Sequence, residues 1–165
     1  MALEECLVDK LIEKNFKISF AESCTGGLCC GNLVNVTNAS KVLDVSFVTY
    51  ANEAKMEFLG VKADTILSNG VVSEEVAYEM AQGVSSVAKS QVGVGITGVA
   101  GPGGGTDKKP VGMVCFGFCI NGETITFTKQ FGEIGRNQVR KSSVEFVYNK
   151  LIELLGDSDE KIIQK

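Results

Sequence analysis

The sequence predicts an α/β fold in which a mixed β-sheet carries helices on both faces. Segments with the apolar periodicity of amphipathic helices alternate with short runs rich in β-branched and aromatic residues. Two such runs, 112–120 and 123–131, are separated only by Asn121-Gly122, a preferred sequence for a two-residue hairpin turn. A hairpin pairs its strands antiparallel, so the predicted sheet is not entirely parallel.

The composition is that of an ordinary globular domain. The chain has 165 residues, 44% of them hydrophobic and 22% charged, which predicts a single domain over 1–165 with a frayed, charged tail at 157–165. Its 16 basic and 20 acidic residues give a formal charge of -4, so no nucleic-acid partner is expected. The sequence shows no apolar run of membrane-spanning length and no cleavable signal, so we expect a cytoplasmic protein with no membrane partner.

Local patterns in the first third of the chain predict helices that alternate with strands. Leu3, Leu7 and Leu11 form an apolar stripe at helical spacing. The later run around Phe47 is rich in β-branched and aromatic residues, as strands are. The predicted elements are a helix over 1–15, a strand over 18–21, a helix over 28–36 and a strand over 45–50.

Polar and glycine residues mark the ends of the remaining helices. Asn52 is the expected N-cap of a short helix that Gly60 ends, which places Lys55 in its first turn. Ser73 is the expected N-cap of the next helix, and Gly156 should end the last one. The other predicted elements are strands over 91–97, 112–120 and 123–131 and a final helix that starts near Arg136 or Asn137.

The segment Phe20–Gly27 should turn from the first strand into a helix, with Ser23 at the edge of the sheet. Gly26 and Gly27 allow a sharp turn and the close approach of a ligand. Free amides at the start of the following helix would favour an anion there, either a phosphate or a transient oxyanion. Ser23 itself is open to two interpretations, a catalytic nucleophile or a capping serine.

The chain contains no histidine and six cysteines. The missing histidine excludes Ser-His-Asp and Cys-His catalysis, so another side chain must carry any proton transferred near neutral pH. The cysteines show no C-x-x-C spacing, so we expect buried reduced thiols and predict neither a metal site nor a cofactor. Cys24 is the rival nucleophile to Ser23, because a helix N-terminus would acidify its thiol.

Ser23, Tyr50 and Lys55 together form a conceivable serine–lysine system. A neutral lysine can accept a serine proton, but an ammonium with the ordinary pKa of about 10.4 is not a base at pH 7. Desolvation or a nearby positive charge would have to lower that pKa. Arg136 and Arg140 are candidates for this charge, and they are equally candidates for holding a substrate phosphate or for a solvated first helical turn.

The glycine-rich segment Thr97–Thr106 follows a predicted strand, which is where ligand sites of α/β proteins usually lie. It matches neither the P-loop nor the dinucleotide-binding pattern. Two interpretations remain open, a glycine-lined ligand loop with Lys108 and Lys109 nearby or a mobile surface loop.

Several motifs match one family in order along nearly the whole chain. They are AESCTGG at 21–27, VTYANEAK at 48–55, GVVS at 70–73, GVAGPGG at 98–104 and KPVG at 109–112. On these residues the chain resembles the CinA carboxy-terminal domain family, the nicotinamide-nucleotide amidohydrolases also called PncC. Members of that family convert nicotinamide mononucleotide and water to nicotinate mononucleotide and ammonia.

The resemblance implies a three-layer α/β/α sandwich and a serine–lysine amidohydrolase that uses neither metal nor cofactor. Many members also carry an amino-terminal domain that resembles molybdopterin-binding proteins, and its absence from this sequence implies the stand-alone form. The implied partner is the small molecule nicotinamide mononucleotide. A homo-oligomer is expected, with a number of subunits that the sequence does not specify.

Motif positions imply that Ser23 is the nucleophile, Lys55 the general base and Tyr50 its helper. The family motif near the last helix usually reads Gly-Asp-Arg, whereas here Arg136 directly follows a glycine, so Arg140 remains the alternative. The residues expected to contact the substrate or to offer amides to an oxyanion are Thr25, Gly26, Gly27, Thr97, Gly98, Arg136 and Arg140.

A second class of function also fits the resemblance. The chain would then be a catalytically inactive nucleotide-binding or interaction module related to competence/damage-inducible proteins. The presence of Ser23, Tyr50 and Lys55 argues against this alternative, whereas binding of nicotinamide mononucleotide without release of ammonia would favour it.

Overall fold

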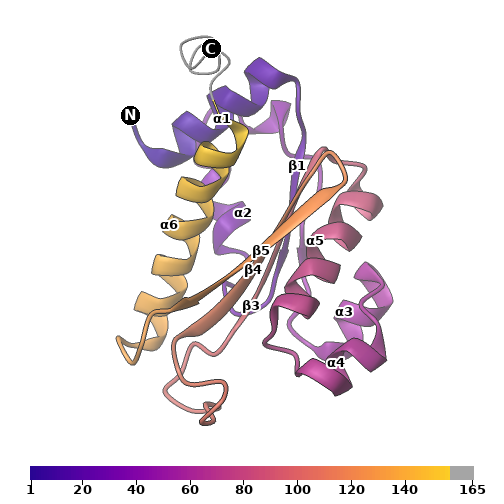
Figure 1. Ribbon diagram of the computed structural model, residues 1–165. Coiled ribbons are helices and arrows are strands. Elements are labelled where there is room, and N and C mark those ends of the chain that lie inside the picture. The colour runs from indigo at the N-terminus through magenta and orange to yellow at the C-terminus, as the bar shows by residue number, and fades with distance from the viewer. Residues whose placement is uncertain (157–165) are drawn as a thin grey trace, which may run out of the picture.

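The computed structural model describes residues 1–156 and forms a five-stranded sheet in the order β2-β1-β3-β4-β5 (Figure 1). The tail predicted to be frayed, 157–165, lies outside the described residues. The strands are β1 (Ile18–Glu22), β2 (Phe47–Val48), β3 (Val92–Gly98), β4 (Met113–Ile120) and β5 (Glu123–Gln130). The helices are α1 (Leu3–Lys14), α2 (Leu28–Leu33), α3 (Asn52–Leu59), α4 (Ala63–Asn69), α5 (Glu74–Ala88) and α6 (Arg136–Leu155), with a 3-10 turn η1 (Ala39–Lys41).

Helices cover both faces of the sheet, which confirms the predicted three-layer α/β/α fold. In Figure 1, α1, α2 and α6 lie on one face, and α3, α4 and α5 lie on the other. Helices α1, α2 and α6 share one buried cluster with the sheet, to which they contribute Leu7, Leu33 and Val147, respectively. Val76 and Met80 of α5 belong to a second buried cluster on the opposite face. Within residues 1–156, no helix is long and apolar enough to span a membrane.

The sheet combines parallel and antiparallel pairs, as the hairpin predicted. Strands β2, β1 and β3 run parallel, whereas β3–β4 and β4–β5 are antiparallel. Asn121 and Gly122 form the two-residue turn between β4 and β5 with φ values of 50° and 87°, a backbone region in which these two residue types are favoured. The parallel strands therefore end at the same edge of the sheet, toward the bottom of Figure 1.

Several predicted boundaries were wrong by a few residues. The strand expected over 45–50 contracts to β2, because this edge segment pairs only with the end of β1. The helix expected over 28–36 ends at Leu33. Ala51, rather than Asn52, is the N-cap of α3. Helix α4 was not predicted, because none of its residues is buried and its apolar residues form no clear stripe.

Two glycines facing each other across β3 and β4 bring α5 close to the sheet. Gly95 pairs with Gly117, and a Cβ atom on either residue would lie 2.6 Å or 2.3 Å, respectively, from the main-chain oxygen of Ala77. Cβ atoms in proteins do not approach an oxygen so closely, so these positions require glycine for this helix–sheet distance. Strands β3 and β4 are thereby held under α5, and the carboxyl ends of β3 and its parallel neighbour β1 present the site described next.

Candidate active site

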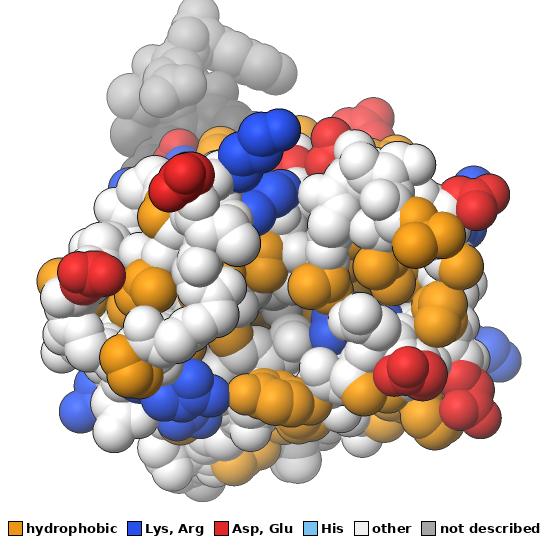
Figure 2. Space-filling model, turned by 90° about the horizontal axis from the view of Figure 1, so that it is seen from below, with side chains coloured by type: hydrophobic (Ala, Val, Ile, Leu, Met, Phe, Trp, Pro, Cys, Tyr) orange, Lys and Arg blue, Asp and Glu red, His pale blue; other side chains and the backbone are white. Residues whose placement is uncertain are grey.

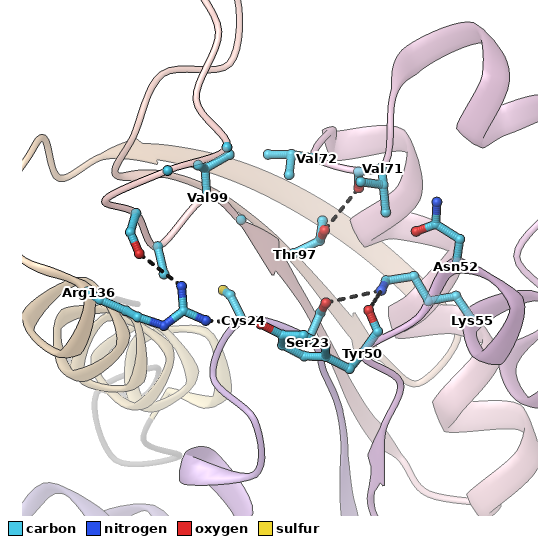
Figure 3. Close-up of a pocket in the computed structure, with 15 residues that line it drawn as sticks. Ser23, Cys24, Tyr50, Asn52, Lys55, Val71, Val72, Thr97, Val99 and Arg136 are labelled. Atoms are coloured by element: carbon cyan, nitrogen blue, oxygen red, sulfur yellow. Dashed lines mark hydrogen bonds between the residues drawn. The ribbon is translucent and has the colours of Figure 1, made fainter.

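A pocket opens where β1 and β3 end, between the glycine-rich loop, α3 and the start of α6. Figure 2, which views the molecule from the lower end of Figure 1, shows this end hollowed at its centre. Of the residues predicted from sequence, the pocket is lined by Ser23, Tyr50, Lys55, Thr97, Gly98 and Arg136 (Figure 3). The structure thus brings together residues from four separate sequence regions.

Ser23 follows the last residue of β1 at the start of a tight turn. Its main-chain N–H donates to the oxygen of Ile96 in β3, and its carbonyl accepts from the N–H of Gly26. Gly26 and Gly27 have φ values of 58° and 101°, so both occupy the left-handed region that favours glycine. The turn is therefore anchored to β3 and presents Ser23 in the pocket.

The buried carboxylate of Glu22 occupies the amides that were expected to bind an anion. Its two oxygens accept from the N–H groups of Cys29 and Cys30, at 2.9 and 3.0 Å, in the first turn of α2. The helix dipole favours a negative charge at this position. The anion at the start of α2 is thus a side chain of the protein itself, and the expectation of a free anion site there was wrong.

Lys55 reaches from α3 to Ser23 through the protein interior. Only 1% of the residue is exposed. Its Nζ donates to Ser23 Oγ at 3.0 Å and to the main-chain oxygen of Tyr50 at 3.3 Å (Figure 3). It also donates to the main-chain oxygen of Thr49 at 2.7 Å. Neither salt bridge found within residues 1–156 involves Lys55.

Burial lowers the pKa of Lys55 from 10.5 to about 8, because the charged ammonium loses water without gaining a carboxylate partner. The neighbouring Cys24 thiol acts weakly in the opposite direction. Desolvation was one of the two causes considered from sequence. The other, a nearby arginine, does not contribute to this shift.

Cys24 also lines the pocket, but its environment is the reverse of what was expected. Burial raises the pKa of its thiol to about 11, and the opposing effects of the backbone and of Arg140 are smaller. The predicted acidification was wrong because the loss of water around the buried thiol outweighs the lowering effects of the backbone and of Arg140, and the nearby Glu22 carboxylate adds to the increase. Since the thiolate is the reactive form of cysteine, this environment disfavours Cys24 as a nucleophile.

Arg136 and Tyr50 meet across the pocket. Arg136 Nη2 donates to the Tyr50 hydroxyl at 3.0 Å, and its Nη1 donates to the main-chain oxygen of Gly101 at 2.9 Å. Tyr50 is 61% exposed, so this contact lies at the solvent side of the site. Arg136 is itself exposed and lines the pocket.

Arg140, one helical turn later, faces the Ser23 turn from behind. Its Nε and Nη2 donate to the main-chain oxygens of Cys24 and Thr25 at 2.9 and 3.1 Å. Neither Arg140 nor Thr25, Gly26 and Gly27 lines the pocket. Thr25 is fully buried, and its hydroxyl has no partner within the part of the chain that the structure describes. The substrate contacts predicted for these residues stay predictions.

Outside the glycine-rich loop, three further residues line the pocket that were not among the predicted site residues. Val71 and Val72 come from the connection between α4 and α5, and Asn52 comes from the first turn of α3. Thr97, buried at the end of β3, donates its hydroxyl to the main-chain oxygen of Val71 at 2.9 Å. Valine and asparagine side chains are common on any surface, so the residue types themselves gave no signal. Only the family motifs that contain them, GVVS and YANEAK, indicated these segments.

Fold and site define an α/β protein with a serine–lysine pair in a pocket at the carboxyl ends of parallel strands. The chain belongs to the CinA family: the model of the CinA C-terminal domain matches residues 1–155. Crystal structures of competence/damage inducible proteins from Agrobacterium tumefaciens and Enterobacter asburiae superpose with TM-scores of 0.89 and 0.90, at 37% and 36% identity. Each comparison covers 93% of this chain and 96% of the other. The resemblance inferred from motifs is thereby confirmed.

Curated relatives are longer than this chain. It is 47% identical over 156 residues to a protein of Clostridium acetobutylicum that carries the provisional name of a competence-damage inducible protein. It is 46% identical over 145 residues to a CinA-like protein of Kosmotoga olearia. These matches cover 93% and 88% of this chain but only 38% and 35% of the relatives. The names do not state a reaction.

Proposed function

We propose that this protein is an amidohydrolase that converts nicotinamide mononucleotide and water to nicotinate mononucleotide and ammonia. The supporting observation is the contact of 3.0 Å between Lys55 Nζ and Ser23 Oγ, in a site where burial brings the lysine pKa to about 8. A lysine of this pKa is partly neutral near physiological pH and is able to accept a proton. The choice of substrate rests on the family resemblance.

In the proposed reaction, Ser23 Oγ attacks the carboxamide carbon while its proton passes to Lys55 Nζ. The resulting tetrahedral intermediate collapses to an ester on Ser23, and the Lys55 ammonium returns the proton to the departing ammonia. Water then attacks the ester, with Lys55 accepting its proton and giving it back to Ser23 Oγ. Nicotinate mononucleotide leaves, and both side chains return to their starting states.

The developing oxyanion requires donors other than the first turn of α2, which binds Glu22. The Gly26 N–H is also engaged, by the carbonyl of Ser23. We assign the oxyanion to the amide of Gly98. The amides of Thr25 and Gly27, expected from the sequence to contribute, belong to residues that do not line the pocket. Gly98 lines the pocket at the end of β3.

The phosphate of the nucleotide is assigned to Arg136. Arg136 is the cation other than Lys55 that lines the pocket. A guanidinium binds phosphate well because its N–H groups match the geometry of the phosphate oxygens. The glycine-rich loop, of which Gly103 and Gly104 also line the pocket, allows close approach of the ligand to its backbone.

The proposal is tested by measuring ammonia release from nicotinamide mononucleotide with the parent and with Ser23→Ala, Lys55→Ala and Cys24→Ala. We expect the first two variants to lose about 10³-fold or more in kcat and Cys24→Ala to stay within about threefold of the parent. Full activity in Ser23→Ala would exclude the assignment of the nucleophile. Binding of the nucleotide by a folded parent without ammonia release would instead support a binding module.

A further inference from the structure

Residues 69–72, which comprise the last residue of α4 and the start of the connection to α5, form one wall of the pocket through Val71 and Val72. Two of its carbonyl groups, those of Asn69 and Val72, accept hydrogen bonds from the side-chain amine of Lys109. Lys109 lies at the far end of the glycine-rich loop, where the sequence left its role open. Its amine is directed to main-chain oxygens of this wall, and the residue does not line the pocket.

The two intervening carbonyls are also held by side chains. The hydroxyl of Ser73, the N-cap of α5, donates to the oxygen of Gly70 at 2.8 Å. The hydroxyl of Thr97 donates to the oxygen of Val71 at 2.9 Å. Four consecutive carbonyls of the 69–72 segment thus accept side-chain hydrogen bonds, and Lys109 makes the first and the last of them.

The main chain of Lys109 is itself fixed. Its N–H donates to Thr106 Oγ1 at 3.0 Å, and its carbonyl accepts from the N–H of Thr106 at 2.9 Å. These bonds close a tight turn at the end of the glycine-rich loop. The loop and the 69–72 segment, which lie about 40 residues apart in sequence, are therefore joined through one ammonium group.

We infer that Lys109 is a positioning residue that holds Val71 and Val72 against the substrate, and that these side chains form an apolar wall for a flat aromatic ring carrying the carboxamide. Val71, Val72 and Val99 line the same pocket as Ser23 and Lys55 (Figure 3). Apolar side chains favour the face of a ring over a charged or hydrated group. The inference deepens the proposed function and rests on it for the identity of the ring.

Removing the amine of Lys109 leaves two carbonyls of the wall without a donor from the protein. Unpaired polar groups favour conformations in which water reaches them. The 69–72 segment should then move away from the pocket, while Ser23 and Lys55, held by β1 and α3, keep their positions. Binding of the ring should weaken, whereas the chemical step on a bound substrate should change little.

If Lys109 bound the substrate phosphate instead, its replacement would have a different effect on the two substrates. A phosphate ligand affects only the nucleotide, whereas a wall that contacts the ring affects the nucleotide and the phosphate-free nucleoside nicotinamide riboside alike. We therefore compare both substrates with Lys109→Met, with Lys109→Arg, which retains donors for the two carbonyls, and with Lys108→Met as the matched control. Lys108 is exposed and does not line the pocket.

For Lys109→Met we expect KM to rise about tenfold for both substrates, with kcat within about threefold of the parent and an unchanged pH profile. Lys109→Arg should restore at least half of the loss, and Lys108→Met should match the parent. Hydrogen exchange, measured without substrate, should be about tenfold faster in peptides covering 69–72 in Lys109→Met only.

Exchange in Lys109→Met as slow as in the parent would overturn the proposal that Lys109 holds the 69–72 segment. A KM increase confined to the nucleotide would overturn the wall in favour of a phosphate ligand, and a loss of kcat alone would overturn the positioning role. The exchange measurement needs no turnover. If the parent hydrolyses neither substrate, the proposed function fails, but hydrogen exchange still shows whether Lys109 holds the 69–72 segment.

Discussion

The side-chain nitrogen of Lys55 lies 3.0 Å from the hydroxyl oxygen of Ser23, and the two main-chain oxygens of Thr49 and Tyr50 complete its surroundings. An ammonium donates to all three oxygens. A neutral amine has two hydrogens, which suit the two carbonyls, and one lone pair, which suits the proton of Ser23. The geometry therefore accommodates both protonation states that a general base must adopt.

The pH dependence of activity should report the lowered pKa of Lys55. Because the neutral amine is the active form, kcat/KM should rise about tenfold per pH unit below pH 8 and level off above it. Lys55→Arg should lose about 10³-fold or more throughout, because a guanidinium stays protonated in this range. Stopped assays of ammonia release between pH 6 and 9.5 provide the measurement. A flat profile with full activity at pH 6 is incompatible with Lys55 as the base.

Arg136 and Arg140 should give opposite kinetic patterns. Arg136→Met removes the proposed phosphate contact, so KM for nicotinamide mononucleotide should rise about 10- to 100-fold while hydrolysis of nicotinamide riboside changes little. Arg140→Met removes two bonds to the turn that carries Ser23, so kcat should fall for both substrates. Steady-state kinetics on the two substrates distinguish these patterns. An equal loss on the riboside in Arg136→Met would refute the phosphate assignment.

Glu22→Gln should destabilise the fold. Both carboxylate oxygens of Glu22 accept main-chain N–H groups of α2, and an amide replaces one acceptor with a donor facing another donor. We expect the free energy of unfolding in urea to fall by about 1–3 kcal/mol. Glu145→Gln, at an exposed position of α6, serves as the control and should stay within about 0.5 kcal/mol of the parent. Equal stability of the two variants would show that the buried carboxylate is dispensable.

Gly117→Ala should separate α5 from the sheet. The added Cβ would lie 2.3 Å from the main-chain oxygen of Ala77, so the helix has to move. We expect a loss of about 2 kcal/mol or more in the free energy of unfolding. Gly31→Ala in α2 is the matched control, because nothing lies within 4 Å of its added Cβ and alanine favours helices. A Gly117→Ala variant as stable as Gly31→Ala would contradict the close helix–sheet packing.

Local patterns predicted most of the fold because turns, helix caps and apolar periodicity depend on residues that are close together in the sequence. The hairpin at Asn121-Gly122, the N-cap at Ser73 and the helix stop at Gly60 were all confirmed. Helix α4 was missed, and the strand at β2 was predicted to be longer than it is. Both lie at the periphery of the fold, where few buried side chains mark an element. Their boundaries depend on contacts with the rest of the protein rather than on a strong local signal.

The sequence by itself determined the order of most of the elements, placed Ser23 where a strand ends and put Lys55 near the start of a helix. Only the tertiary structure decided that Lys55 is buried from water and donates to Ser23. It also decided that Glu22 accepts from the N–H groups of α2 and that Arg136 rather than Arg140 lines the pocket. The physical reason is that capping, turns and periodicity act over a few residues. Burial and side-chain hydrogen bonds depend instead on which segments the packed layers bring together.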